Sequence, residues 1–162
     1  MDKKDRNAKI EAYGNGFNLL TQALAEVPTE AREFKPTPAD WSVHKIVVHM
    51  ADSESMAALR VRKLIVEPGS QLMGYDEARW ADALHYKDQN MGDALEIIKF
   101  ARQSTYRLLK TLPENVFEHE VHHPEYDRPY SFDRWLEIYS RHIPDHIDQL
   151  QRSVQAWRES KH

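Results

Sequence analysis

Apolar side chains recur every three or four positions in long stretches of this chain, the spacing that places them on one face of a helix. The stretches run from about Asp5 to Ala25, Val43 to Val66, Met91 to Leu112, and Ser131 to Lys161. Pro68 and Gly69 follow the second stretch and Pro113 follows the third, and such residues commonly end helices. The pattern therefore predicts four long amphipathic helices, with a shorter helix around residues 77–84.

Long connections separate these helices. The segment "VPTEAREFKPTPAD" holds three prolines and ends just before Ser42, whose hydroxyl can cap the second helix. The segment "FEHEVHHPEYDRPYS" predicts an irregular crossover with one short strand, because Pro124 and Pro129 exclude a long ladder or helix. We therefore expect an all-α fold, a four-helix bundle with long crossover connections, built as a single domain over residues 1–162.

The composition is typical of a globular protein, with 41% hydrophobic and 30% charged residues. The formal net charge of -4 and the lack of a Lys/Arg block argue against nucleic-acid binding. No stretch approaches the roughly 20 apolar residues of a membrane span, and the N-terminus lacks the apolar core of a signal peptide. Since the chain also has no cysteine, we expect a cytoplasmic protein with neither a membrane nor a nucleic-acid partner.

The lack of cysteine also narrows the chemistry, because any metal must be held by His, Asp or Glu. In "RHIPDHIDQL", His142 and His146 lie four positions apart on the inward face of the last predicted helix, where both rings can reach one ion. The spacing alone is weak evidence, since nine histidines in this chain yield roughly half such a pair by chance. A second pair, His119 and His123, lies in the proline-rich crossover and is expected in a surface loop.

A third histidine, His49, falls within the inward stripe of the second predicted helix. Three inward imidazoles would be costly unless they bind an ion or each find a hydrogen bond, so the pattern alone leaves open a metal site and a set of hydrogen-bonded core histidines. Asp52 lies one turn away in "DSE" and is a candidate general base or partner of a ligand, although a solvated helix face would also explain it.

Several common catalytic motifs are missing from the sequence. "HIPDH" is not H-E-x-x-H, because the acid precedes the second histidine instead of following the first, which argues against a zincin protease. The chain contains no G-x-S-x-G, no Walker loop and no dinucleotide fingerprint. Triad hydrolases and nucleotide-binding enzymes therefore have no support.

Taken in order, "DWSVHKIVVHMADSE", "GYDEARWAD", "HHPE" and "YSRHIPDHIDQL" resemble the DinB-like superfamily, over about Asp40 to Leu150. The similarity is greatest to the branch that contains the bacillithiol S-transferases and proteins named as metal-dependent hydrolases. The resemblance implies a four-helix bundle, usually a homodimer, with zinc or nickel held by His49, His142 and His146 and completed by water. It also implies a substrate pocket beneath the connection that carries Tyr75 and Trp80, and gives no reason to expect DNA binding.

Three neutral histidines would leave a divalent ion its full charge and an open position, as catalytic sites do. Because a coordinated thiol loses its proton and the chain has no cysteine, the sulfur nucleophile must come from a small-molecule substrate. The leading hypothesis is therefore transfer of a low-molecular-weight thiol onto a small electrophile. Asp52 or a metal-bound hydroxide would accept the proton. The alternatives are hydrolysis by metal-bound hydroxide, and a non-catalytic metal-binding module in which the ion only secures the bundle.

Overall fold

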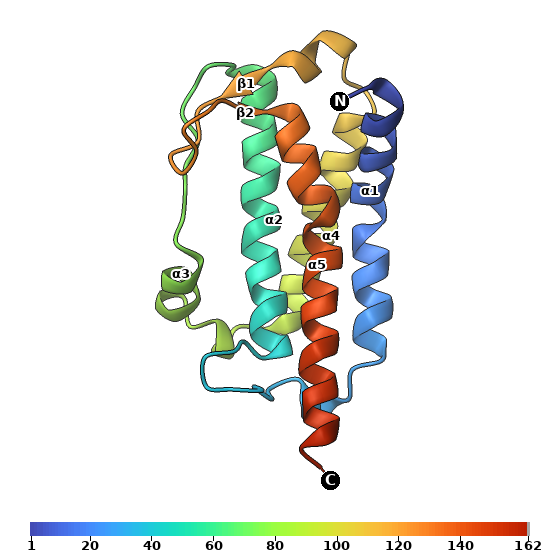
Figure 1. Ribbon diagram of the computed structural model, residues 1–162, viewed down its shortest axis with the longest axis vertical. Coiled ribbons are helices and arrows are strands. Elements are labelled where there is room, and N and C mark those ends of the chain that lie inside the picture. The colour runs from blue at the N-terminus through green and yellow to red at the C-terminus, as the bar shows by residue number, and fades with distance from the viewer. Residues whose placement is uncertain (162) are drawn as a thin grey trace.

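The computed structural model describes residues 1–161, and over these residues four long helices run side by side as a bundle (Figure 1). They are α1 (Lys3–Ala25), α2 (Val43–Val66), α4 (Met91–Leu109) and α5 (Phe132–Glu159). The shorter elements are α3 (Glu77–Ala83), the 3-10 helices η1 (Thr29–Ala31), η2 (Tyr86–Asp88) and η3 (Glu114–Glu118), and the strands β1 (Glu120–Val121) and β2 (Tyr130–Ser131). The predicted all-α four-helix bundle is confirmed.

Local signals in the sequence position the helix ends. The side chains of Asp2, Ser42, Asn90 and Ser131 each accept a backbone N–H in the first turn of the helix that follows, and such caps contribute about 1 kcal/mol each. The Ser42 cap is the one that the sequence predicts. Helix α4 ends at Leu109 rather than at the predicted Leu112, because the residue before a proline is disfavoured in the helical region.

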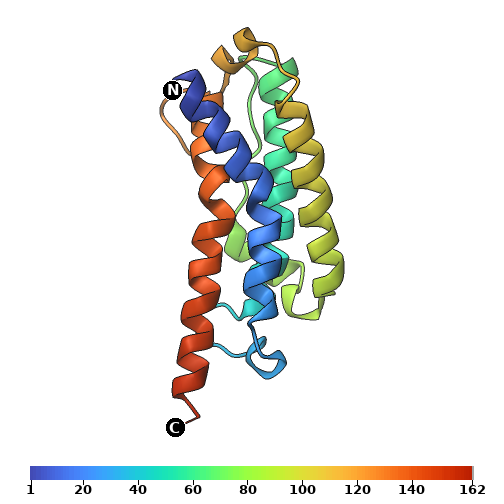
Figure 2. The same cartoon turned by 90° about the vertical axis from the view of Figure 1, so that its right-hand side faces the viewer.

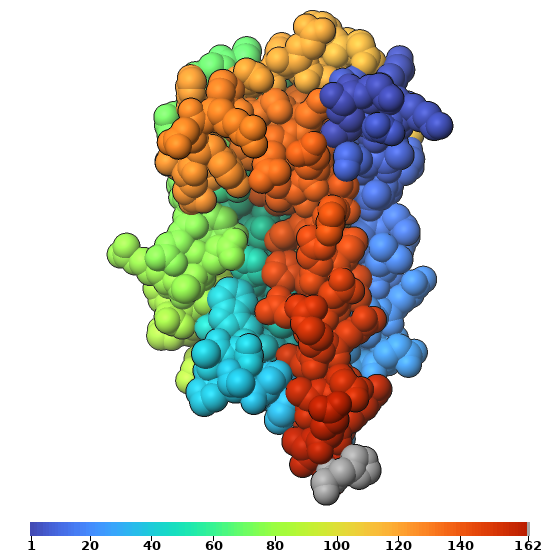
Figure 3. Space-filling view, viewed as in Figure 1, coloured from blue at the N-terminus to red at the C-terminus, as the bar shows by residue number. Residues whose placement is uncertain are grey.

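The helices pair across the bundle, α1 with α5 and α2 with α4. Figures 1 and 2 show that α1 and α5 descend from the same end, whereas α2 and α4 ascend in parallel. A connection over residues 67–90 must therefore return along the whole length of the bundle between α2 and α4. It carries α3 beside α2, on the flank that is shown at the left of Figure 3.

The crossover between α4 and α5 differs from its prediction. Besides the expected strand, a second one forms, and β1 pairs with β2 in antiparallel register with Val121 opposite Tyr130. Strands of two residues show no alternation that a sequence could reveal. The predicted surface position of His123 is wrong, since only 5% of this residue is exposed and its ring stacks on Tyr130 at 5.4 Å between centroids.

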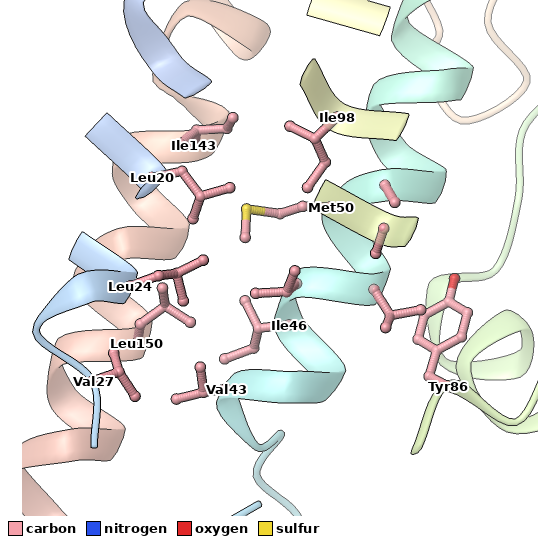
Figure 4. Close-up of a cluster of buried hydrophobic side chains, with 14 of the residues drawn as sticks. Leu20, Leu24, Val27, Val43, Ile46, Met50, Tyr86, Ile98, Ile143 and Leu150 are labelled. Carbon is pink, nitrogen blue, oxygen red and sulfur yellow. The ribbon is translucent and has the colours of Figure 1, made fainter. Parts of the chain in front are cut away.

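Apolar side chains from all the long helices fill the interior. Figure 4 shows one cluster, in which Leu20 of α1, Met50 of α2, Ile98 of α4 and Ile143 of α5 meet. A second cluster lies nearer the β-hairpin, around the fully buried Trp135. Helix α5 runs unbroken through Pro144, so both predicted histidines of this helix stay in one helical register.

Among residues 1–161, no helix combines the length and the apolar content needed to cross a membrane.

Candidate metal centre

His49 of α2 and the two histidines of α5 meet between their helices. Each offers a ring nitrogen, and these nitrogens lie within 4.8 Å of one another. The ring centroids of His142 and His146 are 4.6 Å apart, and His49 lies 5.0 Å from His146 and 5.9 Å from His142. The structure therefore brings together the three histidines that the sequence singles out from remote positions.

The contacts of His142 determine which of its nitrogens is free. Its Nδ1 lies 3.2 Å from Oε1 of Glu54, a side chain with no exposed surface. Burial alone would raise the pKa of the Glu54 carboxyl, but the Arg102 guanidinium and His142 hold this pKa below its usual range. An ionised carboxylate only accepts, so Nδ1 carries the proton and Nε2 keeps its lone pair, to which the Ser53 hydroxyl donates at 3.2 Å.

The surroundings of His146 and His49 also leave a ring nitrogen without a hydrogen-bond donor. Nδ1 of His146 donates to the amide oxygen of Gln149 at 2.9 Å, which leaves the lone pair of His146 on Nε2. His49 is 1% exposed, and its Nδ1 is buried without a hydrogen-bond partner among the described residues. A buried ring with an unpaired nitrogen is costly in a finished core, so His49 fits a metal ligand better than it fits a packing role.

The protonation of these rings also suits a cation. Burial, together with His146 and His142, lowers the pKa of His49 to about 3. Burial and His142 lower the pKa of His146 to about 4. Both rings are thus neutral near pH 7, the state in which imidazole binds a metal.

These pKa values predict how the stability of the metal-free protein depends on pH. Unfolding returns each ring to a pKa near 6.5, so the unfolded state binds more protons as the pH falls from about 6.5 toward 3 or 4. The free energy of unfolding should therefore fall between pH 8 and pH 5, by at most about 2 kcal/mol for each of His49 and His146. Urea unfolding of chelator-treated protein measures this change, and His49→Gln should remove part of it. A free energy that is equal at both pH values would contradict the assignment.

Two cavities include histidines of the cluster in their walls. The first, here called the inner cavity, has a volume of about 150 Å³ and is lined by His142 of the cluster. Other residues in its wall are Ser53, Arg60, Tyr75, Glu77 and Tyr130. The second, here called the outer cleft, has a volume of about 370 Å³. Its wall includes Trp41, His49, Glu77, His146 and Gln149.

Glu77 of α3 lines both the inner cavity and the outer cleft. Its Oε2 lies 3.9 Å from Nε2 of His49, and burial raises the pKa of the Glu77 carboxyl. Tyr75 lines the inner cavity, and the substrate pocket that the resemblance implies at this connection stays a prediction. Trp80 packs on the Tyr75 ring at 4.6 Å between centroids. Glu77 is thus the carboxylate that the fold places where the cavities meet.

Asp52 lies elsewhere. Its carboxylate accepts a hydrogen bond from the hydroxyl of Tyr86, and it does not join the cluster of ring nitrogens in residues 1–161. Its role as a proton acceptor stays a prediction. The acid beside His142 is Glu54, which the sequence pattern had not singled out. The sequence does contain a signal for the burial of Glu54, because this residue follows Met50 by four positions on the inward stripe of α2.

Glu54 is held by a buried ion pair with Arg102 of α4, and neither side chain has exposed surface. Arg102 also donates from Nε and Nη2 to the carbonyl oxygen of Tyr13, and from Nη2 to that of Tyr139. Gly16 leaves room for this guanidinium, since a Cβ at that position would lie 2.8 Å from Nη2. The network ties all the long helices to the acid that holds His142.

The chain is similar to proteins with known folds. The family model of the DinB superfamily matches residues 15–150. YfiT of Bacillus subtilis strain 168, whose name assigns it provisionally to the metal-dependent hydrolases, is 25% identical over 158 residues, which cover 95% of this chain and 88% of YfiT.

Two solved structures show the same fold. That of YfiT, described as having an unusual four-helix bundle topology, gives a TM-score of 0.87 at 21% identity and covers 96% of this chain and 89% of YfiT. That of a mycothiol-dependent maleylpyruvate isomerase gives a TM-score of 0.69 at 14% identity and covers 90% of this chain and 60% of the isomerase.

Proposed function

The chain belongs to the DinB superfamily, and from that premise we propose that it is a metal-dependent enzyme that transfers a low-molecular-weight thiol onto a small electrophile. The observation that carries the proposal is the meeting of three ring nitrogens at the junction of the inner cavity and the outer cleft. His49, His142 and His146 would hold a divalent ion, zinc or nickel. When bound, such an ion lowers the pKa of a coordinated thiol or water and polarises the electrophile.

The residues around the histidines support a reaction between two small molecules. Because His142 lines the inner cavity and His49 and His146 line the outer cleft, each reactant would have a cavity of its own beside the histidines. Since the chain has no cysteine, the sulfur must come from a substrate. Oε2 of Glu77, which lies 3.9 Å from Nε2 of His49, would accept the thiol proton, and Glu54 would hold His142 in the orientation that presents Nε2.

A second candidate is hydrolysis of an ester or amide. The name of YfiT favours this reaction, and the same arrangement of histidines and Glu77 would serve it with water as the nucleophile. The two reactions differ in one requirement, because hydrolysis needs no thiol. A third possibility is a metal-binding module without catalysis.

The test is a rate measurement on metal-loaded protein. Candidate thiols are mixed with a chromogenic aryl chloride, and release of chloride with formation of the thioether is followed. We expect a thiol-dependent rate that falls at least tenfold in His142→Ala, because the ligand and its Glu54 contact are lost together. His122→Ala, which removes an exposed histidine, should keep the wild-type rate.

The outcomes separate the candidates. Equal rates for wild-type protein and His142→Ala would remove the transferase. Turnover of a nitrophenyl ester without thiol, lost in His142→Ala, would favour the hydrolase instead. Metal binding without either activity would leave the non-catalytic module.

A further inference from the structure

The wall of the inner cavity contains polar atoms that the folded chain does not satisfy. The hydroxyls of Tyr75 and Tyr130 and Nε of Arg60 are excluded from solvent and have no hydrogen-bond partner among the described residues. Tyr130 as a whole is 1% exposed. Each unsatisfied buried group costs about 1–3 kcal/mol, so three in one wall call for an explanation beyond packing.

Arg60 brings a positive charge to this wall. Its Nη1 donates to the Tyr139 hydroxyl and its Nη2 to the Met73 carbonyl oxygen, each at 3.0 Å. Its guanidinium also lies 5.9 Å from the centre of the Tyr75 ring. These contacts fix the guanidinium, but none involves an acid, and within the described part of the chain no carboxylate forms an ion pair with Arg60.

His123 adds another donor. Its Nδ1 accepts the backbone N–H of Glu125 at 3.3 Å, and burial lowers the pKa of the ring, so that its proton lies on Nε2. The Tyr139 hydroxyl accepts from Arg60 and keeps its own proton for another acceptor. The cavity wall is therefore rich in hydrogen-bond donors around the fixed guanidinium of Arg60. A ligand group that only accepts hydrogen bonds matches such a wall.

We propose that the inner cavity binds a carboxylate group of the substrate through Arg60 and the hydroxyls of Tyr75 and Tyr130. A carboxylate has no proton to donate and offers about four lone-pair sites, which matches a guanidinium and two hydroxyls. This inference rests on the proposed function, because His142 lines the same cavity and a carboxylate held there would keep the rest of the molecule beside the histidines.

The acids of the same wall limit which anions can enter. Glu77 and Glu125 both line the inner cavity. Their negative charges oppose a dianion more strongly than a monoanion. The volume of about 150 Å³ also favours a small group. A monocarboxylate therefore fits the cavity better than inorganic phosphate does.

The experiment uses propionate as the probe, propionamide as its neutral match in shape, and inorganic phosphate as the competing anion. Binding is followed by chemical-shift changes of the tyrosine and His123 rings, in metal-loaded protein and again after chelation. Propionate should bind in both states with similar affinity, because its contacts do not include the ion. Propionamide and phosphate should each bind at least tenfold more weakly.

Variants assign the contacts. Arg60→Met should weaken propionate binding at least tenfold, whereas Arg62→Met, on the same helix but bonded to Ser104 and Thr105 of α4, should leave it unchanged. Tyr75→Phe removes a hydroxyl that has no partner, so it should weaken binding about threefold without lowering the melting temperature. If Arg60→Met fails to fold, propionate binding by Tyr75→Phe alone tests the proposal.

Either of two results would overturn the proposal. One is that propionamide or phosphate binds as tightly as propionate, and the other is that both Arg60→Met and Tyr75→Phe bind propionate like the wild type. Because binding is measured after chelation as well, a failure of this proposal is distinguishable from a failure of the metal-dependent reaction. The latter appears as loss of activity with propionate binding intact.

Discussion

Replacing His49 by alanine should abolish stoichiometric binding of zinc or nickel, and with it the stabilisation that either ion gives the folded protein. In the proposed site, His49 is the ligand that α2 would supply, and the remaining histidines both belong to α5. A ligand that binds only the native state at about 1,000 times its Kd stabilises that state by about 4 kcal/mol. For a domain of this size, that corresponds to a rise in melting temperature of about 10 °C.

The measurement pairs metal analysis of dialysed protein with melting curves recorded with and without the ion. His122→Ala is the matched control, because it removes an exposed histidine and should retain both the metal and the shift. A His49→Ala protein that still carries one ion per chain, with an unchanged shift, would show that His49 is not a ligand. A shift that persists without bound ion would point to a nonspecific effect of salt.

Replacing Arg102 by methionine should lower the free energy of unfolding by about 3–5 kcal/mol, because the Glu54 carboxylate would be left as an uncompensated charge in the core. The loss also frees the carbonyl oxygens of Tyr13 and Tyr139. Urea unfolding measures the change. Arg107→Met, on an exposed position of the same helix, should change stability by less than about 0.5 kcal/mol.

The double variant Glu54→Gln with Arg102→Met identifies the cause. If an unpaired charge is responsible, the double variant should be more stable than the sum of the single losses predicts. Additive losses would instead indicate that packing dominates. Glu54→Gln should also weaken metal binding by about 10-fold to 100-fold, since His142 loses the acceptor at its Nδ1.

The sequence by itself determined the helices of the bundle and much of its local detail. The bounds of α2 and the Ser42 cap follow from the three-to-four spacing of apolar residues and from a cap residue just before the helix, signals that act within one or two turns. The alignment of His142 with His146 follows from the same short-range geometry. Such features are predictable because each depends on neighbours along the chain.

Only the tertiary structure decided what surrounds those histidines. Glu54 meets Arg102 and His142 across separations of 48 and 88 positions, and no local pattern marks which helices bring them together. The burial of His123 depends on strands too short to show a period. The donor-rich wall of the inner cavity likewise joins α2 and α5 with the connections over residues 67–90 and 110–131. Helix packing sets these meetings, because side chains far apart in sequence become neighbours only after the elements dock.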